Sequence, residues 1–231
     1  MERRADETGE GDGGAAEHHL EVGRTARYWT LGDPASDPEE VWLVLHGYGQ
    51  LARRFLGRFG CLASERRLIV APEALSRFYI RSEEGRHGPD AVVGATWMTS
   101  EDREAEIRDY VAYLDGLASA VMRGNPRVTV LGFSQGVATA WRWITYGSPG
   151  RLERLVSWAG VFPPDLDVER AASALRSTDV SLVSGEKDTT VHPEVAEEAA
   201  ARLDAAGIAF AVLRHPGGHD IDEATLLRIA G

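Results

Sequence analysis

Gly132-Phe133-Ser134-Gln135-Gly136 is the segment from which the fold of this chain is most readily inferred. An apolar, β-branched run at 128–131 precedes it and a helix-compatible run at 137–144 follows it, so a strand turns sharply into a helix here. This is the context that a G-x-S-x-G nucleophile elbow requires, although the five residues alone would also suit an ordinary loop. A serine at such a turn is held in a strained backbone conformation, and glycines two residues before and after it remove Cβ atoms that would clash.

Length and composition indicate one ordinary globular domain. The chain has 231 residues, of which 43% are hydrophobic and 26% charged, and no apolar run approaches the roughly 18 residues of a membrane span. Residues 1–16 are rich in Glu, Asp, Arg and Gly and are expected to form a disordered acidic tail, not a secretion signal. We therefore expect a single α/β domain at 17–231 with no integral membrane association.

Charge and cysteine usage limit the partners and the compartment. The formal net charge of -11, with Arg residues interleaved with Glu and Asp, argues against a nucleic-acid partner. Cys61 is the one cysteine, which excludes an intramolecular disulfide and predicts a reducing, cytoplasmic location; its apolar neighbours suggest a buried structural thiol. No H-E-x-x-H or comparable ligand cluster occurs, so no metal site is expected.

Alternating strand and helix patterns on both sides of the pentapeptide predict the architecture. Residues 18–30 alternate polar and apolar side chains around Gly23 and predict an antiparallel hairpin at a sheet edge. Buried strands are expected at 41–45, 68–70, 128–131, 155–160, 180–185 and 210–213, and helices at 51–63, 104–121, 137–144, 168–175, 192–206 and 221–229. This order predicts an open, doubly wound, mostly parallel sheet of about eight strands with right-handed crossovers. Residues 72–100 show no regular period, and their aromatic side chains argue against disorder.

Two later loops can supply the base and the acid that a serine nucleophile needs. A serine hydroxyl is a weak nucleophile until a base takes its proton, and that base needs a third group to orient it. In the chain order usual for this elbow the acid and the histidine follow the serine, each beyond a later strand. Asp188 and His219 meet this condition, and the ends of parallel strands share one edge of a sheet. We therefore expect Ser134, Asp188 and His219 to converge as nucleophile, orienting acid and general base.

Each of these two assignments has competitors in the sequence. His215 and His192 also follow the serine and are alternatives for the base. Glu186 and Asp220 lie near the same sheet edge as Asp188, which could itself be only a solvated loop carboxylate, whereas Asp179 precedes its strand and lies at the opposite edge.

Two backbone N–H groups are candidates for an oxyanion hole. The N–H of Gln135 follows the serine directly and lies at a helix N-terminus. The second donor should come from the turn His46-Gly47-Tyr48-Gly49, with the N–H of Tyr48 as the best candidate. His46 precedes the serine, so we interpret it as a structural histidine that braces this turn.

Four motifs in this order carry a resemblance to a known family: HGYG at 46–49, GFSQG at 132–136, SGEKD at 184–188 and GGH at 217–219. With them the sequence resembles the α/β-hydrolase superfamily, and within it the phospholipase/carboxylesterase family that includes acyl-protein thioesterases. The resemblance extends from about residue 17 to the end of the chain. It implies hydrolysis of carboxylic esters or thioesters without a cofactor, and the roles given above for Ser134, Asp188, His219, Tyr48 and Gln135.

Two departures from the family pattern affect the expected substrate. Gln50 follows the HGYG turn where the family usually has aspartate, and Val137 replaces the glycine that often follows GFSQG. Only residues 161–166 separate a predicted strand from the next helix, at the place where large caps usually enter, so the cap should be minimal or absent. The candidates for lining an acyl pocket are Phe78, Tyr79, Trp97, Met98 and Phe162, and a core role suits Trp97 equally well.

Taken together, these features predict a serine carboxylesterase that hydrolyses short to medium acyl esters through an acyl-enzyme intermediate. Its partner is expected to be a small-molecule ester or thioester. An acyl thioesterase or lysophospholipase of the same family is the first alternative. A catalytically silent hydrolase-fold protein that only binds a small molecule is an alternative of another class. The sequence makes no prediction about the oligomeric state.

Overall fold

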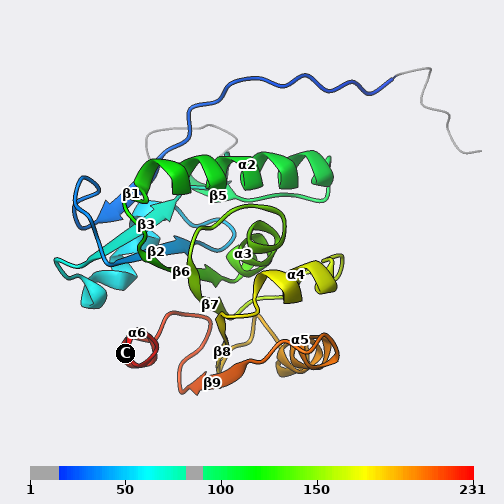
Figure 1. The fold of residues 1–231 in the computed structure, drawn as a ribbon. Coiled ribbons are helices and arrows are strands. Elements are labelled where there is room, and N and C mark those ends of the chain that lie inside the picture. The colour runs from blue at the N-terminus through cyan, green and yellow to red at the C-terminus, as the bar shows by residue number, and fades with distance from the viewer. Residues whose placement is uncertain (1–15, 82–90) are drawn as a thin grey trace, which may run out of the picture.

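A seven-stranded sheet forms the centre of the computed structural model, which describes residues 16–81 and 91–231 (Figure 1). Its strands run in the order β1-β3-β2-β6-β7-β8-β9, and every neighbouring pair is parallel except the edge strand β1, which lies antiparallel to β3. The doubly wound, mostly parallel sheet is confirmed, with seven strands in the described residues instead of about eight. Residues 1–15 of the predicted tail lie outside the described range.

The elements alternate along the chain as the sequence patterns predict. The strands of the main sheet are β1 (Tyr28–Leu31), β2 (Glu40–Leu45), β3 (Arg67–Pro72), β6 (Arg127–Phe133), β7 (Leu152–Trp158), β8 (Asp179–Gly185) and β9 (Ala211–His215). The helices are α1 (Ala52–Leu56), the 3₁₀ helix η1 (Gly57–Leu62), α2 (Arg103–Val121), α3 (Gln135–Tyr146), α4 (Val168–Ala174), α5 (Pro193–Ala205) and α6 (Glu223–Ala230). Nothing but a loop separates β7 from α4, at the place where a cap would enter.

Helices cover both faces of the sheet, which is why its central strands are apolar on both sides. Helices α2 to α5 bury one face, whereas α1, η1 and α6 bury the other (Figure 1). Successive side chains of β2 illustrate this: Leu43 belongs to the first core, and Trp42 and Val44 belong to the second. The pattern is that of a parallel strand covered by crossover helices.

The hairpin predicted at 18–30 is wrong. Residues 16–27 form no strand, and β1 alone pairs with the sheet, through contacts such as Thr30 with Val70. Leu20 and Val22, whose alternation suggested the first strand, are 85% and 77% exposed. An alternating pattern makes a strand only where its apolar side chains find a surface to cover, and these two find none.

A second, two-stranded sheet occupies the segment in which no element was predicted. It pairs β4 (Ser76–Arg81) with β5 (Val92–Thr96) in antiparallel fashion. Ala95 of β5 accepts a hydrogen bond from the N–H of Gly49 (2.9 Å) and donates one to the carbonyl of Gln50 (3.2 Å). This hairpin therefore holds the turn at 46–50 in place from one side.

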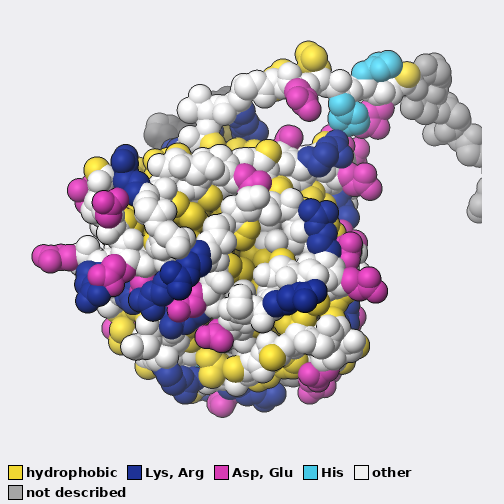
Figure 2. All heavy atoms as spheres, viewed as in Figure 1, with side chains coloured by type: hydrophobic (Ala, Val, Ile, Leu, Met, Phe, Trp, Pro, Cys, Tyr) yellow, Lys and Arg dark blue, Asp and Glu magenta, His cyan; other side chains and the backbone are white. Residues whose placement is uncertain are grey.

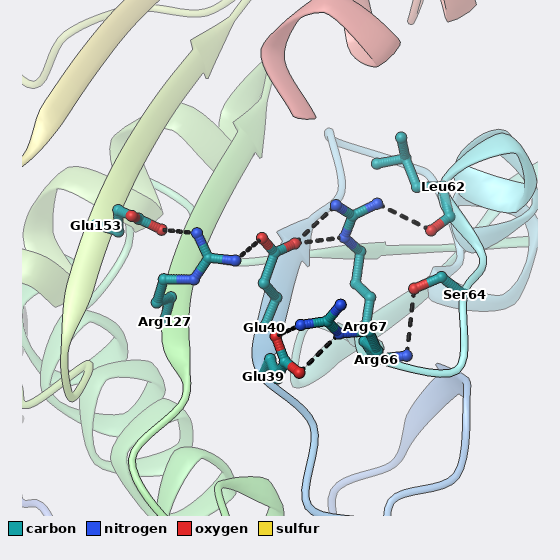
Figure 3. A network of polar contacts seen from close by, with 8 residues as sticks. All are labelled: Glu39, Glu40, Leu62, Ser64, Arg66, Arg67, Arg127 and Glu153. Carbon is teal, nitrogen blue, oxygen red and sulfur yellow. Dashed lines mark hydrogen bonds and ion pairs between the residues drawn. The ribbon is translucent and has the colours of Figure 1, made fainter. Parts of the chain in front are cut away.

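An ion-pair network fixes the starts of the central strands, at the edge opposite to the one where they end (Figure 3). Glu40 opens β2 between two register partners, Arg67 on β3 and Arg127 on β6. Its carboxylate pairs with Arg67 at 2.7 Å and Arg127 at 2.5 Å, and Arg127 also lies 3.6 Å from Glu153. The Glu40 side chain is only 12% exposed, so this network is shielded from water better than an ordinary surface ion pair.

Acidic and basic side chains are interspersed on the face that Figure 2 presents, with hydrophobic side chains between them. Among the helices of the described residues, none has both the length and the apolar character needed to cross a membrane. Cys61 is half-buried in η1, less than predicted, and burial raises the pKa of its free thiol.

Candidate active site

The pentapeptide forms a tight strand-to-helix turn with Ser134 at its apex. Ser134 has φ 54° and ψ -118°, a conformation that costs energy for any residue with a Cβ. A Cβ on Gly132 would lie 2.3 Å from the carbonyl oxygen of Gly136, and one on Gly136 would lie 2.2 Å from that of Leu45. The two glycines thus allow the backbone of β2, β6 and α3 to approach closely enough to hold the serine in this strained position. The N–H of Ser134 donates to the carbonyl of Trp158 at 2.9 Å.

The turn lies where the winding of the sheet reverses. From β2 the chain goes outward to β3, then returns to place β6 on the other side of β2. Ligands of open α/β sheets bind outside the carboxyl ends of the strands at such a switch point. Ser134 follows β6 at this point, and the turn at 46–50 follows β2.

Asp188 and His219 meet at the same edge. The Nδ1 of His219 lies 2.8 Å from the Oδ2 of Asp188, and the other carboxylate oxygen, Oδ1, accepts from the N–H groups of Thr190 (2.8 Å) and Val191 (3.0 Å). Burial, which leaves the Asp188 side chain 2% exposed, would raise its pKa, but these hydrogen bonds outweigh it and the pKa is lowered. An ionised Asp188 accepts the Nδ1–H of His219, which leaves the other ring nitrogen, Nε2, free of hydrogen.

Backbone contacts hold the two loops against each other. The N–H of Glu186 donates to the carbonyl of His215, and that of Lys187 donates to the carbonyl of Gly217, both at 2.9 Å. The His219 ring also packs on Phe133, with ring centroids 4.9 Å apart, so it lies beside the residue that precedes Ser134. Within the described residues, no hydrogen bond joins Ser134 Oγ to His219. Catalytic hydrogen bonds are often long or poorly aligned before a substrate binds.

The competing candidates lie elsewhere or are engaged otherwise. The buried His215 packs on Trp158 and accepts the N–H of Gly217, and the exposed His192 lies at the start of α5. Among the alternative acids, Glu186 is exposed and Asp179 begins β8 at the far edge. Asp220 forms an ion pair with Arg58. Of these residues, Asp188 is the acid that contacts His219.

The two expected oxyanion donors belong to the helix that follows Ser134 and to the turn that follows β2. The N–H of Gln135 lies in the first turn of α3, where no helical acceptor exists, and the N–H of Tyr48 has no acceptor in the described part of the chain. The Gln135 side chain is fixed by the segment after β5, because its Nε2 donates to Thr96 Oγ1 and to the carbonyl of Met98, both at 2.9 Å. Neither N–H group has a backbone acceptor among the described residues, and both remain candidate donors.

Side chains around the 46–50 turn hold it in shape. The fully buried His46 accepts the N–H of Ala74 at Nε2 (3.1 Å), so its Nδ1–H donates to the carbonyl of Gly47 (2.8 Å). Burial lowers the pKa of His46 and keeps it neutral, which suits this bonding pattern. Gln50, at the position that departs from the family pattern, accepts the N–H of Gly47 through its Oε1 at 2.9 Å.

A cavity of about 420 Å³ opens beside the serine. Its lining comes from the segment after β5, from α3 and from the loops that follow β7 and β8: Met98, Ser134, Gln135, Ala138, Thr139, Arg142, Gly160, Val161, Thr190 and Val191. Most of this wall is apolar, as in sites that bind small organic molecules.

Of the five residues proposed for the acyl pocket, Met98 lines this cavity. Trp97 and Phe162 do not, because both are buried in the core, Trp97 against His46 and Phe162 against Trp141. Phe78 packs on the ring of Tyr48, and Tyr79 is 51% exposed on β4.

Arg142 also lines the cavity, although it was not among the residues predicted for the site. The signal was present, because Arg142 interrupts an otherwise apolar helix and follows Ser134 and Ala138 at intervals of four residues. Val137, the second departure from the family pattern, is buried and packs against Gly160. A Cβ added to Gly160 would lie 2.4 Å from the Cγ2 of Val137.

Comparison with known proteins shows the family to which the chain belongs. Residues 38–225 match the model of the family described as serine hydrolase (FSH1). A search of curated proteins finds no match.

Solved structures share the fold at low sequence identity. Acyl-protein thioesterase 2 of Zea mays is 19% identical with a TM-score of 0.66, and the comparison covers 89% of this chain and 96% of that one. A carboxylesterase of Mesorhizobium loti is 19% identical with a TM-score of 0.67, and the comparison covers 89% of this chain and 95% of that one. Esterase PE8 is 22% identical with a TM-score of 0.65, and the comparison covers 89% of this chain and 96% of that one. The α/β-hydrolase fold predicted from the sequence is thereby confirmed.

Proposed function

Because the chain belongs to the FSH1 serine hydrolase family, we propose that it is a carboxylesterase that uses Ser134, His219 and Asp188 as its triad. The observation that carries this proposal is the hydrogen bond between His219 and Asp188 beside a strained serine turn. With Nδ1–H held by Asp188, His219 presents an unprotonated Nε2 toward the serine side of the site.

The reaction then proceeds in two steps. Ser134 Oγ attacks the ester carbonyl while His219 Nε2 takes its proton, and the tetrahedral oxyanion is stabilised by the N–H groups of Gln135 and Tyr48. The alcohol leaves with the proton from His219, and an acyl group stays bound to Ser134. Water, deprotonated by the same histidine, releases the acid and restores the serine.

Short to medium acyl chains suit the size and the course of the cavity. Its volume of about 420 Å³ lies in the range of small-molecule sites, and it extends along α3 from Ser134 past Ala138. A thioesterase is a second candidate, supported by the fold shared with the Zea mays acyl-protein thioesterase. A cytoplasmic location remains a prediction that rests on the single cysteine.

Replacement of Ser134 by alanine tests the proposal. Ser134→Ala should abolish hydrolysis of 4-nitrophenyl butyrate and leave the circular dichroism spectrum unchanged, and retained turnover would contradict the assignment. A panel of oxygen esters and acyl-CoA thioesters of matched chain length distinguishes the esterase from the thioesterase. If the folded protein hydrolyses neither and its serine resists a fluorophosphonate, the protein only binds its ligand.

A further inference from the structure

A buried arginine lies in the cavity two helical turns beyond the serine. Ser134, Ala138 and Arg142 follow one face of α3 at intervals of four residues, and all three line the cavity. Eight residues of helix correspond to a rise of about 12 Å. An acyl group attached to Ser134 therefore extends along a wall of α3 toward a positive charge.

The charge of Arg142 is not fully balanced. Asp165 pairs with Arg142 Nη2 at 2.8 Å and with Arg103 Nη2 at 2.6 Å, so one carboxylate serves two guanidinium groups. Burial would raise the pKa of Asp165, but the two arginines outweigh it and lower the pKa to about 2. Among the described residues that line the cavity, Arg142 is the only charged one. The three side chains together carry one net positive charge.

Arg142 also has hydrogen-bonding capacity that the protein leaves unused. The residue is only 4% exposed, yet its Nε is buried without a partner among the described residues. Its Nη1 lies 3.3 Å from the sulfur of Met98, which is a weak acceptor, and the buried Tyr110 hydroxyl also interacts with the guanidinium group. Buried donors are almost always satisfied in folded proteins, so a guanidinium group that lines a cavity and keeps one nitrogen on so weak an acceptor points to a stronger acceptor that arrives with the ligand.

Building on the proposed esterase function, we infer that Arg142 binds a carboxylate at the far end of the acyl group. The substrate class is then the half-esters of medium-chain dicarboxylic acids, whose methylene chain lies along the apolar wall. A guanidinium group binds carboxylates with charge-assisted hydrogen bonds. The carboxylate takes no part in the chemistry: the ester bond breaks, water adds to the acyl-enzyme, and a dicarboxylic acid and an alcohol are released.

The experiment compares esters that differ only in the terminal charge. Two matched pairs are used: ethyl hexanoate with monoethyl adipate, and ethyl octanoate with monoethyl suberate. For each ester kcat/KM is measured by titration of the released acid. The kcat/KM of the charged ester is then divided by that of the neutral ester, which gives the charged-to-neutral ratio of the pair. The wild-type protein should prefer the half-ester at one of these lengths. A wild-type protein without such a preference at either length overturns the inference, whatever the variants do. A preference instead for neutral acids esterified to an ω-hydroxy carboxylate would also overturn it, since the carboxylate would then lie on the alcohol side.

Variants identify the residue responsible. Arg142→Gln should lower the charged-to-neutral ratio about tenfold or more, which is the effect of losing one charge-assisted contact, and Arg142→Lys should restore part of it. Arg103→Gln is the matched control: it removes the other partner of Asp165 and one positive charge, but no donor of the cavity wall, so it should lower the ratio less than Arg142→Gln does. An equal loss in Arg103→Gln would assign the effect to the ion pairs instead, and would overturn the role of Arg142.

A binding measurement separates this inference from the proposed function. If neutral esters are hydrolysed and half-esters are not preferred, the inference alone fails. If no ester is hydrolysed, calorimetric titration of the wild-type protein and Arg142→Gln with suberate still decides the matter. Binding that disappears in the variant supports the carboxylate site, and equal or absent binding overturns it.

Discussion

Replacing Asp188 by asparagine tests how the loop after β8 controls the histidine. The carboxylate has two distinct sides: Oδ1 accepts the N–H groups of Thr190 and Val191, and Oδ2 faces His219 Nδ1 at 2.8 Å. In Asp188→Asn the amide oxygen must face the two backbone donors, because the reverse orientation would leave both unsatisfied. At about 1–3 kcal/mol for each donor, the preference is about 2–6 kcal/mol. The amide NH₂ then points at Nδ1, and the proton of His219 moves to Nε2.

A histidine with its proton on Nε2 cannot accept the proton of Ser134. The energy difference corresponds to a factor of about 30 to 20,000 in the population of the active tautomer. We therefore expect kcat/KM for 4-nitrophenyl butyrate to fall at least about 30-fold, with the loss in kcat. Asp220→Asn, which changes an exposed carboxylate of the neighbouring loop, should keep activity within about threefold. An Asp188→Asn protein that is folded and as active as Asp220→Asn would refute this account of the site.

Three further predictions concern the scaffold of the site. Gly136→Ala would place a Cβ 2.2 Å from the carbonyl oxygen of Leu45. This clash should lower the free energy of unfolding, measured by urea titration, by about 3 kcal/mol or more. An unchanged free energy of unfolding would show that the turn is not tight. Burial lowers the pKa of His46 from its ordinary 6.5, so the unfolded chain binds a proton that the folded chain excludes, and stability falls as the pH drops below about 6.5. Urea titrations at about pH 7.5 and 5.5 should show a smaller loss on acidification in His46→Gln, and an equal loss would contradict this. Glu40→Ala leaves the shielded Arg67 without its carboxylate and should cost roughly 2 kcal/mol, whereas Glu39→Ala, at an exposed pair, should cost clearly less; equal losses would show that the burial of the first pair is unimportant.

The sheet could be predicted from the sequence because local patterns and chain order agree there. A run such as 41–45 is apolar at every position, which only a strand covered on both faces requires, and the helix at Arg103–Val121 has a clear apolar stripe. Residues 18–30 also alternate polar and apolar side chains, but this alternation does not show whether another part of the protein is present to cover the apolar side chains. The β4–β5 hairpin was missed for the opposite reason, since Tyr79 and Ile80 are exposed and no apolar period marks the strand.

The meeting of Asp188 and His219 was predictable, whereas the cavity was not. Both residues directly follow parallel strands, so topology alone places them at one edge. The walls of the cavity depend on how side chains pack between α3 and three loops, and periodicity does not encode this. Trp97 was expected equally in the pocket or in the core, and its Nε1–H donating to the carbonyl of His46 places it in the core. Arg142 was visible as a charge in an apolar helix, but only the structure shows that it borders a cavity.

Covalent labelling shows directly whether Ser134 is a reactive nucleophile. The claim is that the strained serine of the turn, activated by His219, is the nucleophile. Trypsin releases the peptide 128–142, in which Ser134 is the one serine, so mass spectrometry can locate a fluorophosphonate adduct within it. We expect stoichiometric labelling of this peptide in the wild-type protein, none in Ser134→Ala and much slower labelling in Asp188→Asn. A folded wild-type protein whose peptide 128–142 stays unlabelled, or is labelled in Ser134→Ala as well, would contradict the claim.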